Sequence, residues 1–125
     1  MENDKNIYII KKNRFTLSGA TLPEMFVKSV DINFIKKTLE VELYGVCDKG
    51  VFPCHDWLDE FKNNSEDFVL TIWDGYGVKL FKYLFHVPKL KDRTESFNYD
   101  DTDELIITSV FSFNEVERIN ALFGR

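Results

Sequence analysis

Residues 68–87 read FVLTIWDGYGVKLFKYLFHV, two apolar runs on either side of a short acidic turn sequence. The turn consists of Asp74, Gly75, Tyr76 and Gly77. Asp-Gly between two runs rich in aromatic and β-branched residues is a strong signal for a β-hairpin. The stretch therefore predicts an antiparallel hairpin with strands at residues 68–73 and 78–87.

A second hairpin is predicted upstream, where apolar and polar residues alternate on both sides of a turn at residues 35–38. After this turn, the apolar residues at 39, 41 and 43 alternate with Glu40 and Glu42. An alternation with period two indicates a strand with one face in the core and one face in water. We therefore expect Glu40 and Glu42 on the wet face.

Shorter signals complete the predicted strands. Residues 7–10, IYII, predict a first strand that residues 15–17 continue, and residues 105–113 predict the last long strand. Residues 97–104, between the second hairpin and the last strand, form an aromatic and acidic segment that predicts a turn.

Two helices are predicted. Residues 56–62 lie between the two hairpins, with His55 or Asp56 as the cap and an apolar stripe that begins at Trp57. The spacing of Val116, Ile119 and Phe123 predicts a short terminal helix over residues 114–123.

Together these elements predict one mainly β domain over residues 1–125, with residues 1–6 flexible. The expected architecture is an antiparallel β-sandwich or small barrel, with one short α-helix between the hairpins and a second at the C-terminus. Aromatic residues make up 15% of the chain, which suits half-buried pleated surfaces.

The charge and the cysteine content restrict the functional classes. A net charge of −5 argues against a duplex-binding surface, which needs clustered Lys and Arg. The charged start, MENDK, indicates no secretory signal, and no apolar run is long enough to span a membrane. Two cysteines make no disulfide framework, so we expect synthesis in a reducing, intracellular compartment.

Residue types of a zinc site occur at Cys47, Cys54, His55 and His86. Their spacing does not match that of known zinc sites. Thiol catalysis would need a Cys thiolate beside a His, and the adjacent Cys54 and His55 point apart on an extended backbone. We therefore expect no metal, no cofactor and no catalytic residue, with a small metal-dependent enzyme as the alternative.

Four charged segments also lack the pattern of a ligand site. The carboxylates of residues 100–104 do not follow the calcium-loop pattern, and the 74–77 turn lacks the lysine of a phosphate loop. The basic clusters at residues 11–14 and 36–37 have no interleaved aromatic residues. They are expected to be solvated turns, or to contact an acidic patch on a neighbouring subunit.

Four stretches in this order resemble the tail tube protein family of contractile-tailed bacteriophages and, more distantly, the type VI secretion tube protein. They are FTLSGATLPE at residues 15–24, the hairpin at 30–43, HDWL at 55–58, and FNYD at 97–100 with the strand that follows. The resemblance covers most of residues 15–117.

The resemblance implies a non-enzymatic virion structural protein of the tail, synthesised in the host cytoplasm. Such subunits form six-fold rings whose sheets join edge to edge, and the rings stack into a tube through which DNA passes without specific binding. The implied partners are further copies of the chain and other tail or baseplate proteins. No interaction with a membrane is expected.

The candidate interface or lumen residues lie on the predicted wet face, in the second turn and in the loop at residues 19–26. They are Glu40, Glu42, Asp74, Gly75, Tyr76, Gly77, Leu22 and Pro23. Loops on a rigid sheet frequently carry recognition. Tube, baseplate and tail-terminus positions remain open, and the alternative function is a phage assembly chaperone, adaptor or binding module with a similar sheet.

Overall fold

The computed structural model describes residues 7–63 and 66–120, and the segment 1–6 that we expected to be flexible lies outside them. The elements in chain order are β1 (Phe15–Ser18), the 3₁₀ turn η2 (Glu24–Phe26), β2 (Val27–Asn33), β3 (Thr38–Tyr44), α1 (Pro53–Asp59), β4 (Phe68–Trp73), β5 (Lys79–His86), β6 (Lys89–Glu95), β7 (Ile106–Ser112) and β8 (Glu115–Asn120). Both predicted hairpins, the strand at residues 15–17 and the last long strand are confirmed.

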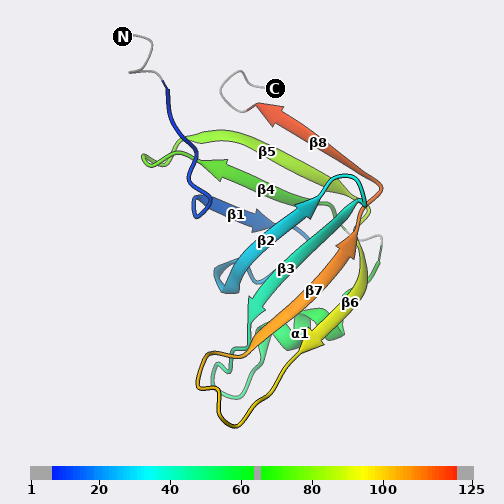
Figure 1. Ribbon diagram of the computed structural model, residues 1–125. Helices are drawn as coiled ribbons and strands as arrows, with labels where there is room; N and C mark the ends of the chain where they lie inside the picture. Colours follow the sequence, from blue (N-terminus) through cyan, green and yellow to red (C-terminus); the bar gives the residue numbers. More distant parts are fainter. Residues whose placement is uncertain (1–6, 64–65, 121–125) are drawn as a thin grey trace.

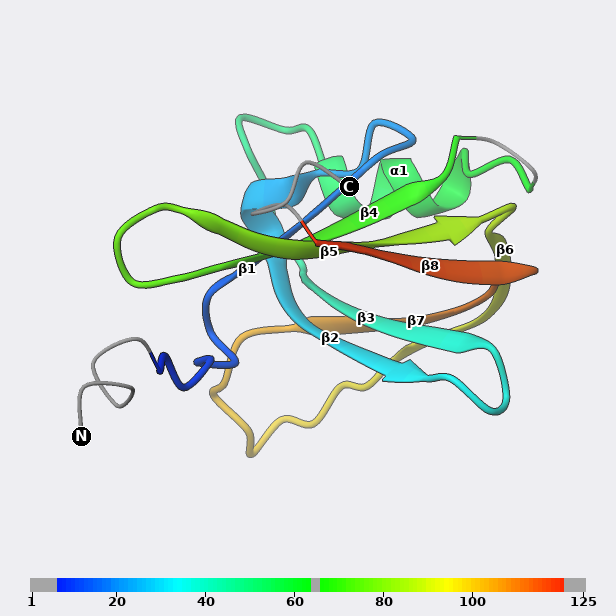
Figure 2. The ribbon, with the colours of Figure 1, turned by 90° about the horizontal axis from the view of Figure 1, so that it is seen from above.

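The strands form two four-stranded antiparallel sheets. Sheet A has the order β1-β4-β5-β8, and sheet B has the order β2-β3-β7-β6. The sheets lie in two layers, with β1, β4, β5 and β8 in one and β2, β3, β6 and β7 in the other (Figure 2). Of the two expected architectures the sandwich is observed, and the sheets of the described residues do not close into a barrel.

The hydrophobic core lies between the two sheets. Its fully buried side chains include Leu17, Leu39, Val41, Leu43, Phe68, Phe85, Ile107 and Phe111. Burying a large apolar side chain contributes about 1.5–3 kcal/mol to the stability of the fold, so the core between the two sheets supplies most of the driving force for folding. Glu40 and Glu42 alternate with the buried residues of β3 and lie on its other, half-buried face, which confirms the predicted alternation.

α1 fills one opening between the two sheets (Figure 1). Its Trp57 ring lies 6.1 Å from the ring of Phe68 in β4 and 5.9 Å from that of Phe111 in β7. The indole Nε1 donates a hydrogen bond to the carbonyl of Ala20 at 2.8 Å, so the buried ring keeps its polar group paired. In the described part of the chain, no helix is long and apolar enough to cross a membrane.

The helix between the hairpins begins three residues earlier than residues 56–62 predict. Pro53 occupies its first turn, where the missing N–H costs no hydrogen bond and the fixed φ favours the helix. The cap residue is Phe52, and no side chain bonds to the helix end. The expected caps, His55 and Asp56, are therefore wrong, because both residues lie inside the helix.

Two predicted elements at the chain ends are also wrong. Residues 7–10 form no strand, and regular pairing begins only at Phe15, which lies opposite Ile72. Residues 115–120 of the predicted terminal helix form β8, which pairs with the free side of β5, while Phe123 lies outside the described residues. A short isolated helix is marginal in water, whereas an open sheet edge offers β8 a complete ladder.

β6 has no counterpart among the predicted strands. Its sequence, KLKDRTE, is mostly charged and shows no apolar alternation. It forms because β7 offers a free edge, with Leu90 opposite Phe111 at the rim of the core. β6 is therefore a strand because it pairs with β7, and its own residues show no periodic pattern that would predict it.

Candidate assembly surfaces

Sheet B has two edge strands, β2 and β6, each with one unpaired side in the described residues. Three antiparallel pairings separate them, so they run in opposite directions. An unpaired edge presents N–H and C=O groups that another chain can complete. The β6 edge of one copy is therefore oriented to pair in antiparallel fashion with the β2 edge of another.

The outer face of sheet B carries a row of carboxylates. Asp31 of β2 lies opposite Glu40 of β3, and one residue of β7 separates Glu40 from Asp92 of β6 in the same row. In the next row, Glu42 accepts a hydrogen bond from the Ser29 hydroxyl at 2.6 Å. We call these four carboxylates, Asp31, Glu40, Glu42 and Asp92, the acidic face.

The turn between β4 and β5 is held by one carboxylate. Asp74 Oδ1 accepts hydrogen bonds from the backbone N–H of Tyr76 at 2.8 Å and of Val78 at 2.9 Å. Gly77 has a φ of 83°, which a residue with a side chain rarely adopts. Gly75 precedes Tyr76 at the tip, and the Tyr76 side chain is 89% exposed. The turn thus presents one aromatic ring at the end of the molecule opposite the β2–β3 turn (Figure 2).

The loop at residues 19–26 is anchored to the core by the side chain of Leu22. Leu22 is buried in the core, and Pro23 is half-buried where η2 begins. Met25, which the sequence did not single out, is the loop's exposed apolar side chain, with 83% exposure. A contact through this loop would therefore involve Met25, while Leu22 fixes the loop to the core.

The two cysteines lie in different environments, and both are free thiols. Cys47 is exposed, whereas Cys54 is buried in α1. Burial raises the pKa of the Cys54 thiol from 9.0 to about 11, because the thiolate would lose its hydration. Cys54 therefore serves as a small core residue.

The two histidines belong to separate carboxylate pairs. His55 Nε2 lies 2.7 Å from Glu95 of β6. His86 Nδ1 lies 2.6 Å from Asp67, and its Nε2 lies 3.2 Å from Glu117 of β8. The hydrogen bond with Asp67 raises the pKa of His86 above 6.5, although partial burial opposes the shift. Among the described residues, no group of three or more His, Cys, Asp or Glu side chains is placed to hold a metal ion.

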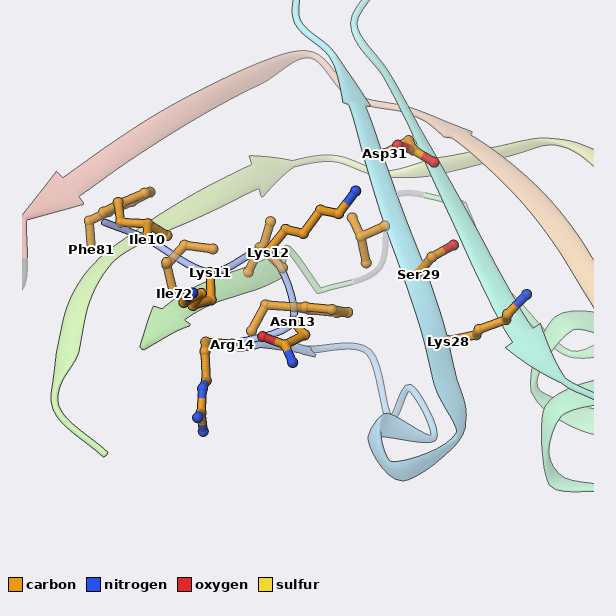
Figure 3. Close-up of a pocket in the computed structure, with 13 residues that line it drawn as sticks. Ile10, Lys11, Lys12, Asn13, Arg14, Lys28, Ser29, Asp31, Ile72 and Phe81 are labelled. Carbon is orange, nitrogen blue, oxygen red and sulfur yellow. The ribbon is translucent and has the colours of Figure 1, made fainter. Parts of the chain in front are cut away.

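A depression of about 450 Å³ lies between the free edges of β1 and β2 (Figure 3). Its apolar lining includes Ile72 and Phe81 of sheet A, and Lys12 reaches from the segment before β1 towards β2. Four cations and one carboxylate, Asp31, also line it. We call it the basic slot, after Lys11, Lys12, Arg14 and Lys28. The sequence shows the cluster at residues 11–14, but only the fold adds Lys28 and the apolar floor.

Solved structures similar to this chain include components of contractile injection systems. The cap that terminates the tube of the anti-feeding prophage matches with a TM-score of 0.68 and 14% identity, over 91% of this chain and 93% of that chain. A chain of the extended sheath–tube complex of the extracellular contractile injection system PVC matches with a TM-score of 0.66 and 14% identity, over 95% and 97%. Hcp1 from Flavobacterium johnsoniae matches with a TM-score of 0.59 and 13% identity, over 83% and 93%.

No protein-family model and no curated protein matches the sequence. The similarity therefore lies in the fold. It covers at least 83% of this chain and at least 93% of each of the three similar chains. The chain has the tube fold of the contractile injection systems, as the resemblance to tail tube proteins predicts.

Proposed function

We propose that this chain is a non-enzymatic structural subunit of a contractile tail or injection apparatus, and that it acts by self-assembly into rings. The observation that carries the proposal is the tube fold, matched over 95% of this chain and 97% of a chain in a sheath–tube complex. Under this proposal the chain occupies the tube, its terminus or the baseplate of a phage tail.

The ring forms through the two edges of sheet B. β2 and β6 run in opposite directions on opposite sides of the same sheet, so one copy can pair with the next by the same contact at every junction. Such a heterologous contact gives a closed ring when the rotation per copy divides a full turn. By analogy with tail tubes we propose six copies, with stacked rings and other tail proteins as the axial partners.

The acidic face lines the channel of this ring. Its row of Asp31, Glu40 and Asp92 crosses all four strands of sheet B, so joined sheets would repeat the row around the circumference. Carboxylates repel phosphate, whereas lysine and arginine bind it through counterion release. DNA could therefore pass through such a channel without binding to it.

Native mass spectrometry across a wide concentration range, followed by negative-stain imaging of the largest species, tests the ring. We expect closed rings with a central hole that appear as the concentration rises. A monomer at every concentration, with no ring in the images, would contradict self-assembly and would favour an adaptor or chaperone that requires a partner.

The channel assignment has its own test in assembled rings or tubes. Glu40→Lys with Glu42→Lys should leave assembly intact and make the particles retain a short fluorescent DNA at 50 mM salt. Glu60→Lys with Glu115→Lys changes the net charge equally at exposed positions outside the acidic face and should not retain the DNA. Equal DNA retention by both variants would show that the acidic face does not line the channel.

A further inference from the structure

The loop between β6 and β7, residues 97–104, lies over the outer face of sheet B. A hollow of about 510 Å³ separates the loop from the sheet, and its lining joins residues of both. The loop contributes carboxylates, and all four strands of the sheet contribute side chains, among them Lys28 of β2, Tyr44 of β3, Thr94 of β6 and Thr108 of β7. Figure 2 shows the loop, in yellow and orange, on the side of sheet B that faces away from sheet A. We call residues 97–104 the acidic loop.

The face under the acidic loop is the one that carries the acidic face. Thr94, Thr108 and Glu42 lie in one row across β6, β7 and β3, so the lining of the hollow continues directly into that face. The next row, which contains Asp92 and Glu40, lies closer to the β2–β3 turn. The acidic loop therefore covers one end of the face that is proposed to line the channel.

The acidic loop has a defined shape in a single copy. Asn98 Oδ1 accepts a hydrogen bond from the N–H of Asp100 at 3.0 Å, and the Asn98 carbonyl accepts one from the N–H of Asp101 at 3.1 Å. Directly after the loop, the Leu105 carbonyl accepts a hydrogen bond from the N–H of Gly45 at 2.8 Å. These bonds hold the turn and fix its base to the end of β3.

The acidic loop adds bulk and negative charge to this end of the sheet. Phe97 is 79% exposed and Tyr99 is fully exposed. Residues 96–105 contain four carboxylates and no cation. Single exposed apolar residues are common on protein surfaces, so the two rings alone identify no ligand. Their position over the outer face of sheet B is the informative feature.

We propose that the acidic loops of a ring form a constriction at one mouth of its channel. This inference rests on the proposed ring, with the acidic face turned towards the axis. The strands of a closed sheet end at its two rims, and the acidic loop joins the end of β6 to the start of β7, so every copy places its loop at the same rim. Because the loop lies on the axial side of the sheet, it extends into the opening.

The constriction is large relative to the channel. Six copies of sheet B make a wall of about 24 strands, which at a spacing of about 4.8 Å and a tilt of about 40° has a backbone diameter of about 48 Å. A segment that packs over a sheet face lies about 10 Å from it. Loops on both sides therefore reduce the backbone width of one mouth to about 28 Å, whereas the other mouth keeps the width of the wall. The channel thus has a direction, with one narrow entrance lined by carboxylates and aromatic rings.

Distances between labels in the assembled ring test the constriction, because the separation of equivalent atoms in neighbouring copies increases with their distance from the axis. Cys47→Ser removes the exposed thiol, and Cys54 is buried. In this background Tyr99→Cys, Glu40→Cys and Glu60→Cys each place one nitroxide label, on the acidic loop, on the channel wall and at the end of α1. Figure 2 shows α1 on the side of the molecule away from the acidic loop.

Pulsed electron paramagnetic resonance should give the shortest nearest-neighbour distance for residue 99, a longer one for residue 40 and the longest for residue 60. In a six-fold ring the nearest-neighbour distance equals the distance from the axis. The value for residue 99 should therefore be about 10 Å shorter than the value for residue 40. Residue 60 is the matched control, because it is also exposed but lies in the outer layer.

A shortened acidic loop provides a second test. Replacing residues 98–103 by two glycines keeps Leu105 and its bond with Gly45. In reconstructions from electron micrographs of the rings, this variant should have one mouth wider than the wild-type ring. The other mouth, at the β2–β3 turns, should be unchanged and serves as the internal control.

The outcomes separate this inference from the proposed function. If the wild-type chain forms no rings, the proposed function fails and the inference fails with it. Rings in which the distance for residue 99 exceeds that for residue 40, or in which the shortened loop leaves both mouths unchanged, would overturn the constriction alone. Rings in which residue 60 gives the shortest distance would show that sheet B faces outwards, and would overturn both the channel assignment and the constriction.

Discussion

Asp31 of β2 and Glu40 of β3 lie directly opposite each other on the outer face of sheet B. Like charges at opposed positions of an antiparallel pair destabilise it by roughly 0.2–1 kcal/mol. This pair therefore lowers the stability of a single copy. In the proposed ring, the same charge would line the channel. The same face carries two further carboxylates, Glu42 and Asp92.

Glu40→Gln should increase the free energy of unfolding by roughly 0.2–1 kcal/mol at low salt, because it removes this repulsion. The gain should shrink at 1 M salt, where the Debye length is about 3 Å. Urea denaturation at two salt concentrations measures it. Glu42→Gln is the control: it weakens the bond from Ser29 and should lower stability by about 1 kcal/mol. Equal effects of both variants would contradict the assignment of repulsion to Glu40.

Trp57→Ala should lower the free energy of unfolding by about 3–5 kcal/mol, because it leaves a cavity among the core aromatic rings and removes the hydrogen bond from the indole to the Ala20 carbonyl. Trp73→Ala should cost less, because Trp73 is only half-buried and its Nε1 bonds to an exposed hydroxyl, that of Thr16. Urea denaturation monitored by circular dichroism gives both values. A larger loss for Trp73 would contradict the role of α1 in closing the core.

Gly19→Ala should destabilise the protein by more than Gly50→Ala. Both glycines have positive φ, 110° and 86°, so each substitution carries backbone strain of about 1–3 kcal/mol. At position 19 a Cβ would also lie 2.2 Å from the Asp67 carbonyl oxygen, whereas at position 50 nothing lies within 4 Å. Thermal denaturation compares the two, and similar melting temperatures would show that the close approach to Asp67 has no cost.

The contribution of His86 to stability should depend on pH. Its pKa is raised in the folded protein by the hydrogen bond with Asp67, so folding favours the protonated imidazole. The stabilisation is fully present below the unfolded pKa of about 6.5 and is lost as the pH rises through the folded pKa. The free energy of unfolding, measured from pH 5.5 to pH 8.5, should decrease accordingly, and His86→Gln should remove this part of the decrease. A decrease of the same size in the variant would assign it to other groups.

A thiol reagent at neutral pH should modify one cysteine per folded chain. Cys47 is exposed, whereas Cys54 is buried with its pKa raised to about 11. Labelling the Cys47→Ser variant should then proceed only as fast as the protein unfolds, and the Cys54→Ser variant should react at once. Rapid labelling of Cys47→Ser would show that α1 opens readily in the native state.

Local patterns in the sequence determined much of the fold. The alternation around Glu40 and Glu42 and the Asp-Gly turn at residues 74–77 predict both hairpins, because a strand with one wet face repeats every two residues. The apolar run at residues 105–113 predicts the strand at the centre of sheet B in the same way. These signals are local, so the chain alone specifies them.

Only the tertiary structure decided the elements that depend on a neighbour. β6 and β8 form because β7 and β5 offer them free edges, although the sequence of β6 gives no strand signal and that of β8 reads as a helix. The basic slot likewise joins Lys28 to residues 11–14 across a gap that no sequence pattern spans. Backbone pairing and the gathering of distant charges are properties of the folded sheets, whereas hydrophobic periodicity is a property of the sequence itself.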